Sequence, residues 1–310
     1  MAAPVSSARA GISAEVWVLV LVLSIPWGAS FLFYRVLAES LPALTIVLVR
    51  LGVAAPILYL LLRLRGQRLR VPWFAFAVMS LLNNVVPFAL YAWAETRVTS
   101  GVASILNAFT PITTALVLHA FGADRLTRGR VLGVVLGLAG VAVLVGADFW
   151  ALNRDFLADL ACLGSTVCYG FAALWSRRIR HVAPLQAACA QVLCGALLLA
   201  PAALLVDRPW LLPMPGLAVW LNLIGLAAFS TAFAYVLYFR ILVVGGPANL
   251  PLVTFLLPVS TVAMAAVFLA EPVTLRALGG TALIVLGLLA IDGRLWRWAR
   301  RRRYDPENQS

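Results

Sequence analysis

Apolar residues fill this sequence in long runs, and the short segments between the runs hold most of the charged residues. A helix needs about 20 mostly apolar residues to cross the hydrocarbon core of a membrane. The runs show no strand-like alternation, so the backbone must satisfy its own hydrogen bonds in helices. The pattern predicts about ten membrane-spanning helices, at residues 16–35, 43–62, 72–93, 100–121, 130–147, 157–176, 184–206, 215–240, 248–270 and 275–292.

The second half of the sequence repeats the first at a fixed offset of 147 positions. The matched pairs include Pro111 and Pro258, Tyr91 and Tyr238, Gly133 and Gly280, Asn107 and Thr254, and the polar pairs Asn83–Asn84 and Ser230–Thr231. Both copies lie in strongly apolar surroundings. Many secondary transporters are built from such a duplicated membrane unit, with the substrate site between the repeats near the middle of the bilayer.

The two copies define the expected domain organisation. We expect a first repeat at 16–147 and a second at 157–292, joined by an outer linker at 148–156. An N-terminal tail, 1–15, and an Arg-rich C-terminal tail, 293–310, flank them. Because five spans is an odd number, the second repeat enters the membrane with the opposite orientation. The predicted fold class is therefore an all-α integral membrane protein of ten transmembrane helices in two inverted five-helix repeats.

Composition agrees with this class, since 63% of the 310 residues are hydrophobic and 12% are charged. Soluble domains are about 45 to 50% apolar and about 25% charged. The net charge of +12 comes from arginine, because the chain has no lysine. In the predicted topology, 18 arginines lie on the inner side and five on the outer side, with Arg50 inside a span. The positive-inside rule then places both termini in the cytoplasm and argues against a nucleic-acid partner.

The first apolar run is expected to be a span and not a cleavable signal peptide, because it is too long for a signal sequence. The Arg300–Arg303 run is expected to bind anionic lipid headgroups. We therefore expect a multi-pass protein of a bacterial inner membrane, with the lipid bilayer and a small-molecule substrate as its partners. A monomer is compatible with the sequence, and the oligomeric state stays open.

Polar and aromatic residues deep in the predicted spans are candidates for a substrate cavity. A polar side chain in hydrocarbon is unfavourable, so it lines a cavity or bonds to a neighbouring helix. Asn83, for example, lies roughly 16 Å from the inner end of its span. Both interpretations remain open for each residue. The predicted cavity lining consists of Trp27, Asn83, Tyr91, Asn107, Tyr169, Ser230, Tyr235 and Thr254.

Arg50 lies about a third of the way into the second span from the outside. It either reaches the surface or pairs with a carboxylate such as Glu95, or it binds a substrate carboxylate. The region matching it in the second repeat carries Gln191, also a hydrogen-bond donor. No acidic residue lies at mid-membrane depth, which favours facilitated over proton-coupled transport. Possible substrate or gating contacts are Arg50, Glu95, Thr110, Thr166 and Tyr238.

Other residue patterns argue against an enzyme. The four cysteines fall within spans at spacings that match neither zinc nor redox motifs. No catalytic constellation is found at a reachable depth, so no catalytic residue, metal or cofactor is expected. Glycines recur on the fifth and tenth spans and predict close helix packing or an intersubunit contact. They are Gly129, Gly133, Gly137, Gly140, Gly279, Gly280 and Gly287.

Several segments together resemble one transporter family. In the first repeat they are Trp27-Gly28-Ala29-Ser30-Phe31, Leu41-Pro42, Arg50, Thr110-Pro111 and Asp124-Arg125-Leu126-Thr127. In the second they are Tyr169-Gly170, Ser176-Arg177-Arg178, Pro184, Gln191, Leu257-Pro258, Glu271-Pro272 and Gly280. From about residue 16 to 292 the chain is similar to EamA-type members of the drug/metabolite transporter superfamily, most of all to bacterial amino acid exporters. The resemblance implies a ten-helix exporter of small metabolites such as amino acids.

The leading hypothesis is therefore an exporter of amino acids, including aromatic or other neutral ones, with broad specificity and an alternating-access mechanism. The alternative within transport is efflux of lipophilic or aromatic cationic drugs, which the ring faces of Trp27 and the tyrosines would bind. A membrane enzyme and a non-transporting scaffold are the hypotheses from other classes. The absence of lysine and of a mid-membrane cation pair argues against a phosphorylated substrate.

Overall fold

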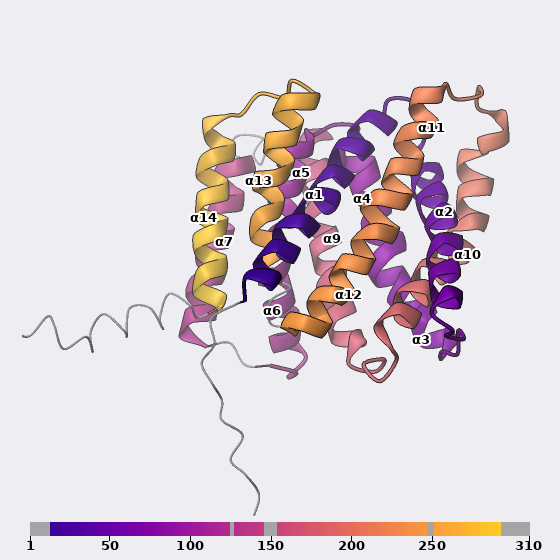
Figure 1. Cartoon of the computed structure of the whole chain (residues 1–310). Coiled ribbons are helices and arrows are strands. Elements are labelled where there is room, and N and C mark those ends of the chain that lie inside the picture. The colour runs from indigo at the N-terminus through magenta and orange to yellow at the C-terminus, as the bar shows by residue number, and fades with distance from the viewer. Residues whose placement is uncertain (1–12, 125–126, 146–153, 247–250, 293–310) are drawn as a thin grey trace, which may run out of the picture.

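The computed structural model describes residues 13–124, 127–145, 154–246 and 251–292, and every regular element in these ranges is a helix (Figure 1). The first half contains α1 (Ala14–Leu37), α2 (Ala43–Leu64), α3 (Trp73–Ser80), the π-helix η1 (Leu81–Val85), α4 (Val86–Ala94), α5 (Ser100–Asn107), α6 (Thr110–Ala120) and α7 (Arg128–Val145). The second half contains α9 (Arg154–Ser176), α10 (Pro184–Asp207), the 3-10 turn η2 (Pro209–Leu211), α11 (Leu217–Ile224), the π-helix η3 (Gly225–Phe233), α12 (Ala234–Gly245), α13 (Pro251–Phe268) and α14 (Leu275–Asp292).

Helical segments lie at every position where the sequence predicts a span, and α3, η1 and α4 form one of them, as do α11, η3 and α12. By length and composition, seven segments can cross a membrane: Ala14–Leu37, Ala43–Leu64, Trp73–Ala94, Ser100–Ala120, Asp155–Ser176, Pro184–Asp207 and Leu217–Gly245. Three further apolar helices are shorter: Val131–Leu144, Leu252–Phe268 and Leu275–Ala290. The predicted tails and linker fall largely outside the described residues.

The two halves of the chain pack against each other throughout the bundle. α7 lies beside α14 at one edge, and α2 lies beside α10 at the opposite edge (Figure 1). Between them α1 contacts α13, and both α4 and α6 contact α9. The buried apolar cluster draws residues from both halves, with Leu51, Ile105 and Leu223 among them. The halves therefore share one core.

Glycines bring α7 and α14 into backbone contact. A Cβ added to Gly280 would lie 2.9 Å from the carbonyl oxygen of Gly140, and one added to Gly287 would lie 2.6 Å from that of Gly133. Only glycine permits such an approach, because any side chain would force the helices apart. The predicted packing role of the glycine stripes is confirmed at these positions, and the contact is made within one chain.

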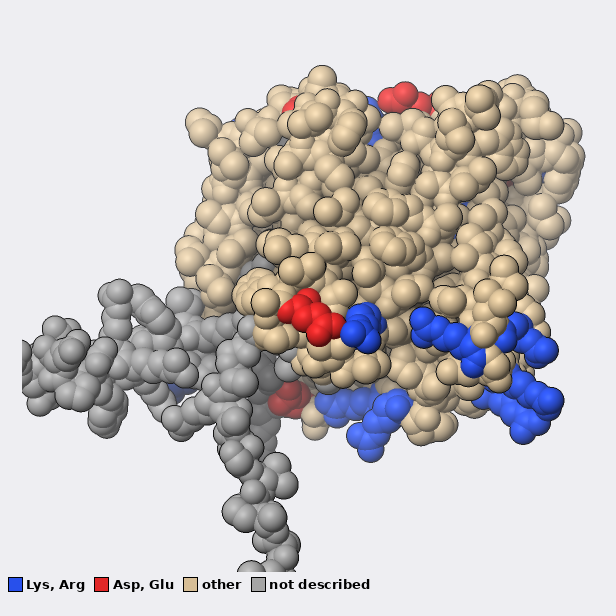
Figure 2. Space-filling model, in the orientation of Figure 1, with Lys and Arg blue, Asp and Glu red and all other residues tan. Residues whose placement is uncertain are grey.

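Basic residues mark one end of the bundle, which we call the basic end (Figure 2). They follow the C-terminal ends of α2 and α9, or lie in the last turn of α2 or within α12, and include Arg63, Arg65, Arg68, Arg177, Arg178 and Arg240. The first residues of α1 and the last of α14 lie toward the same end (Figure 1). All four cysteines carry free thiols, three of them buried, as expected for residues that only pack.

Candidate functional site

Two π-helical segments occupy matching places in the two halves. Shifted by 147 positions, η1 (Leu81–Val85) falls inside η3 (Gly225–Phe233). Short π-helical stretches are rare, and they occur often at functional sites. The polar pairs lie on these segments, Asn83–Asn84 on η1 and Ser230–Thr231 on η3. The polar repeat seen in the sequence thus coincides with a local change in helix geometry.

Amide and phenol groups from both halves form a hydrogen-bonded group that we call the amide cluster. Asn83 Nδ2 donates to Gln191 Oε1 at 3.4 Å, and Gln191 Nε2 donates to the Tyr235 hydroxyl at 2.6 Å. Asn84 Nδ2 donates to the same hydroxyl at 3.4 Å. The amide oxygen of Asn84 is buried without a hydrogen-bond partner among the described residues. The cluster thus joins η1, α10 and α12 and retains an unused acceptor.

Arg50 projects from α2 into the interior of the bundle, and only 4% of it is exposed. Its Nε donates to Thr231 Oγ1 at 2.8 Å, and its Nη1 donates to the Tyr34 hydroxyl at 2.6 Å. The guanidinium carbon lies 3.8 Å from the centre of the Phe88 ring, a cation–π contact. Its location therefore contradicts the expectation that Arg50 reaches the surface.

Within the described residues, no carboxylate forms an ion pair or a hydrogen bond with Arg50. Of the alternatives that the sequence leaves open for Arg50, pairing with Glu95 does not occur, since neither carboxylate oxygen of Glu95 accepts a hydrogen bond from any described residue. Thr231 lies midway between Leu217 and Gly245, so the guanidinium reaches the level of the centre of that segment. A buried cation is unfavourable unless it is paired. The site is therefore suited to an anionic partner.

A second polar contact forms where the fourth predicted span is interrupted between α5 and α6. The Tyr91 hydroxyl donates to Asn107 Oδ1 at 2.9 Å, and the Thr110 hydroxyl donates to the Asn107 carbonyl at 2.6 Å. Tyr91 packs edge-on against Phe31 of α1, with ring centres 5.4 Å apart. Pro111 has no amide hydrogen and stands at the start of α6, which explains the break.

Aromatic side chains line up beside the amide cluster. Trp27 of α1 lies 5.9 Å from Tyr238, and Tyr238 lies 6.3 Å from Tyr235, between ring centres. Tyr235 also stacks on Phe239 at 6.0 Å. Tyr169 of α9 interacts electrostatically with Arg50. Four predicted aromatic residues thus lie on α1, α9 and α12, near the amide cluster or Arg50.

Other predicted site residues make none of these contacts. The Thr166 hydroxyl donates to the Leu163 carbonyl of its own helix. Thr254 lies partly exposed on α13, and Glu95 follows the end of α4. Ser230 is fully buried, and its hydroxyl has no hydrogen-bond partner among the described residues. Site prediction missed Tyr34, Asn84, Phe88, Gln191 and Thr231. The polar pairs were the signal for Asn84 and Thr231.

At the end opposite the basic one, carboxylates of the second half cap helices of the first, and we call this the latched end. Glu271 accepts hydrogen bonds from the Ser100 amide at 3.0 Å, the Ser100 hydroxyl at 2.8 Å and the Gly101 amide at 3.2 Å. Asp207 accepts from the Thr45 amide at 2.7 Å and the Thr45 hydroxyl at 2.9 Å. A carboxylate at a helix N-terminus is favourable for the helix dipole.

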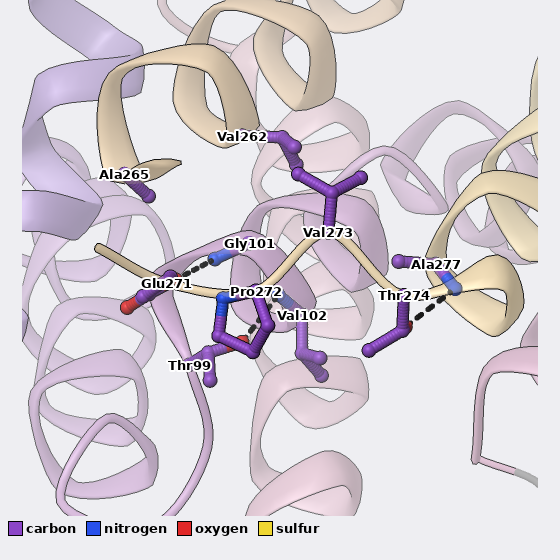
Figure 3. A pocket seen from close by; sticks show the side chains of 10 residues that line it. All are labelled: Thr99, Gly101, Val102, Val262, Ala265, Glu271, Pro272, Val273, Thr274 and Ala277. Carbon is purple, nitrogen blue, oxygen red and sulfur yellow. Dashed lines mark hydrogen bonds between the residues drawn. The ribbon is translucent and has the colours of Figure 1, made fainter. Parts of the chain in front are cut away.

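Glu271 also lines a cavity of about 130 Å³ at the latched end, together with residues of α5, α13 and α14 (Figure 3). A larger hollow, about 440 Å³, lies toward the basic end. Its lining includes Leu82 of η1, next to Asn83, as well as Trp175 and Arg177. Hydrogen bonds also join the halves toward the basic end, from Trp175 Nε1 to the Ala75 carbonyl at 2.9 Å and from Arg177 to the Ala123 carbonyl at 3.1 Å. The bundle is thus joined across its halves at both ends.

Burial raises the pKa of Glu95 well above its usual range; the nearby Glu271 raises it further, and Arg35 opposes both. The surroundings of the Glu95 carboxyl therefore favour its protonated form. The sequence places Glu95 at a helix end and gives no sign of this burial.

Comparison with known proteins assigns the chain to a family. The profile of the EamA-like transporter family matches it twice, at residues 14–146 and 156–291. The chain belongs to the EamA-like transporter family. It is therefore a multi-pass membrane transporter, and the two matches establish the internal repeat.

Similar proteins, two of the three described here with transporter names, match this chain at low sequence identity. The uncharacterized transporter YvbV of Bacillus subtilis is 23% identical over 281 residues, covering 88% of this chain and 90% of YvbV. Protein PecM of Dickeya dadantii is 26% identical over 294 residues, covering 92% and 94%. The uncharacterized inner membrane transporter YedA of Escherichia coli K12 is 28% identical over 215 residues, covering 68% and 69%.

A solved structure described as "Crystal structure of protein" has the same fold, with a TM-score of 0.66 and 19% identity. The match includes 89% of this chain and 97% of the solved chain. At this identity the likeness concerns the fold alone. The names of YvbV and YedA agree with a transporter.

Proposed function

We propose that this EamA-family transporter exports amino acids, aromatic and other neutral ones included, across a bacterial inner membrane. The observation that carries the proposal is the buried guanidinium of Arg50, held by Tyr34 and Thr231 without a carboxylate among the described residues. A fixed cation in a low-dielectric interior attracts an anionic group and repels a cationic one. Arg50 therefore favours a substrate that carries a carboxylate.

The groups around Arg50 supply the remaining recognition that an amino acid needs. Asn84 Oδ1 and the Ser230 hydroxyl are buried and unpartnered, so they can accept hydrogen bonds from an ammonium group. The rings of Trp27, Tyr235 and Tyr238 present apolar faces to a side chain. Few of these groups choose between side chains, which supports broad specificity. Efflux of lipophilic cations is the weaker candidate, because Arg50 would repel them.

Topology in the proposal is ten spans in two inverted five-helix repeats, with both termini in the cytoplasm. Support comes from the two family matches, from the basic end, and from α1 and α14, which begin and end toward that end (Figures 1 and 2). Of the three shorter helices, α13 packs against the long helix α1, and α7 and α14 pack against each other. The basic end then faces the cytoplasm, as the positive-inside rule requires.

Transport in the proposal proceeds by alternating access. The contacts of Glu271 and Asp207 join the repeats at the latched end, which faces outward in this topology. The hollow beside Leu82 lies toward the cytoplasmic end. Export by this mechanism requires the contacts at the two ends to open in turn, those of Glu271 and Asp207 at one end and those of Trp175 and Arg177 at the other.

The test is uptake into proteoliposomes that contain the purified protein. Labelled amino acids are compared with amines of the same side chain that lack the carboxylate, such as phenylalanine with phenethylamine, with and without a pH gradient. The proposal expects several amino acids to be taken up without a gradient and the amines to be poor substrates. Asn83→Ala and Asn107→Ala should weaken the affinity for the amino acids. Preferred uptake of the amines would favour cation efflux instead.

A further inference from the structure

Glu95 is a wholly buried carboxylic acid without a partner. Its relative exposure is 0%, and neither carboxylate oxygen accepts a hydrogen bond from any described residue. Arg35, the nearest cation, donates at 2.9 Å to the backbone carbonyl of Glu95 and not to its side chain. An ionised carboxylate buried in this way costs several kcal/mol. The side chain must therefore carry a proton in this conformation.

The charged and titratable groups that interact with Glu95 come from three helices and one connecting segment. They are Tyr34 and Arg35 of α1, Tyr91 of α4, Cys162 of α9, and Glu271 between α13 and α14; Asp159 of α9 interacts with Cys162. Arg35 is the one cation among them, and Glu271 is the partly exposed acid whose carboxylate caps α5. Glu95 thus lies behind the contact that joins the two repeats at the latched end.

Glu271 and Glu95 are in opposite situations. Glu271 accepts hydrogen bonds from two backbone amides and one hydroxyl at a helix N-terminus, all of which stabilise its ionised form. Glu95 receives none of these and feels the negative charge of Glu271. When α5 separates from the segment that carries Glu271, water reaches Glu95, and its ionised form becomes accessible.

We propose that Glu95 is a proton-binding site whose occupancy holds the latched end closed. On closing, the Glu95 carboxylate takes a proton from water on the outer side and an O–H bond forms. On opening, that bond breaks and the proton returns to the same side. The proton therefore does not cross the membrane, and the site sets the opening probability without driving transport. Acid outside favours the closed state, and a higher outside pH favours opening.

Thermodynamic linkage between proton binding and closure gives the direction of the pH dependence. A group with a higher pKa in the closed than in the open state stabilises the closed state while it is protonated, and this stabilisation is lost as the pH rises. The window extends upward from the ordinary glutamate value of about 4.3 to the raised value of the closed state. Inside this window, each pH unit changes the ratio of closed to open protein by up to about tenfold.

Cys162 supplies a native probe, because it interacts electrostatically with Glu95 and has 0% exposure. The full chain, with Cys168, Cys189 and Cys194 changed to alanine, is labelled with a maleimide in detergent micelles from about pH 5.5 to 8.5. Dividing each rate by that of free cysteine removes the intrinsic pH dependence of a thiol. No substrate is present, so the result is independent of the proposed function.

The parent protein is expected to label several-fold faster, after this correction, at the top of the pH range than at the bottom. Glu95→Gln, which imitates the protonated acid, should label slowly at every pH. Glu39→Gln changes an exposed acid of the segment between α1 and α2 and should behave as the parent does. A Glu95→Gln profile that rises with pH like the parent, or a flat parent profile, overturns the proposal.

The variant Arg35→Gln distinguishes opening that depends on the protonation of Glu95 from a general weakening of the contacts at the latched end. Loss of the positive charge raises the pKa of Glu95, so the rise in labelling should move to higher pH. Loosening alone would increase labelling at every pH, because a contact to the Glu95 carbonyl is weakened. A labelling rate that increases at every pH, without a shift of the profile along the pH axis, contradicts the proposal. This variant tests the proposal even if Glu95→Gln does not fold.

Discussion

Replacing Arg50 by glutamine tests the central feature of the proposed substrate site. The change removes the positive charge and both contacts of the guanidinium, those to Thr231 and to Tyr34. Glutamine is polar and shorter, so it leaves space beside Phe88 for water. We expect Arg50→Gln to bind amino acids weakly while the bundle still assembles.

The magnitude follows from the bond that a carboxylate would make. A hydrogen bond to a charged group contributes about 1.5 to 3 kcal/mol. Each 1.4 kcal/mol is tenfold in affinity. Losing one such bond therefore raises the dissociation constant of a carboxylate substrate about 10- to 100-fold. An amine that lacks the carboxylate cannot make this bond to Arg50. Its affinity should stay the same or improve, because the repulsion between its ammonium group and Arg50 is removed.

The assay is competition against a labelled amino acid in proteoliposomes, with phenylalanine and phenethylamine as competitors. Tyr34→Phe is the matched control, since it removes one hydrogen-bond acceptor of Arg50 and keeps the charge. It should destabilise the protein by about 1 to 3 kcal/mol, from an unsatisfied donor, and retain the preference for the carboxylate. Thermal unfolding of each variant shows whether it is folded.

Equal loss for both competitors would refute the reasoning, since the charge would then not distinguish them. So would an unchanged affinity for phenylalanine. In either case Arg50 would serve the packing of α2 against η3, and the amide cluster alone would remain as the polar recognition element.

Other predictions concern packing and stability. Gly280→Leu should lower the thermal unfolding temperature strongly, because the side chain would enter the backbone of α7; Gly52→Ala, with nothing within 4 Å, should not. Tyr91→Phe should destabilise the protein by about 0.6 to 1.7 kcal/mol in equilibrium unfolding, the range of interhelical hydrogen bonds in membranes. Asp207→Asn should loosen the start of α2, seen as faster amide hydrogen exchange there, with no change if the cap is unimportant.

The sequence predicts the helices of this protein well, because each coincides with an apolar run bounded by charge or proline. Asn83 and Tyr235 were also predicted as site residues, since polar groups deep in a span need a partner. Their direct partner, Gln191, was noticed only as a donor. Hydrogen bonds between distant helices depend on side-chain directions, and these are not encoded in spacing alone.

The burial of Arg50 and the burial of Glu95 were not predicted from the sequence, for one physical reason. The depth of a residue along a helix can be counted from the sequence. The neighbouring helix toward which its side chain points cannot. Arg50 points toward η3, so its partners are hydroxyl groups. Glu95 is enclosed by α1, α9 and the segment that carries Glu271, although it follows the last turn of its helix.

The π-helical turns also record the order of events in the history of this gene. A π turn closes after one residue more than an α turn. Trp73 and Trp220 match upstream of η1 and η3, and Tyr91 and Tyr238 match downstream, at the same offset of 147. Had the extra residue entered only one copy, the offset would differ by one across it. The constant offset is what we expect if the wide turn was already present in the unit that was duplicated.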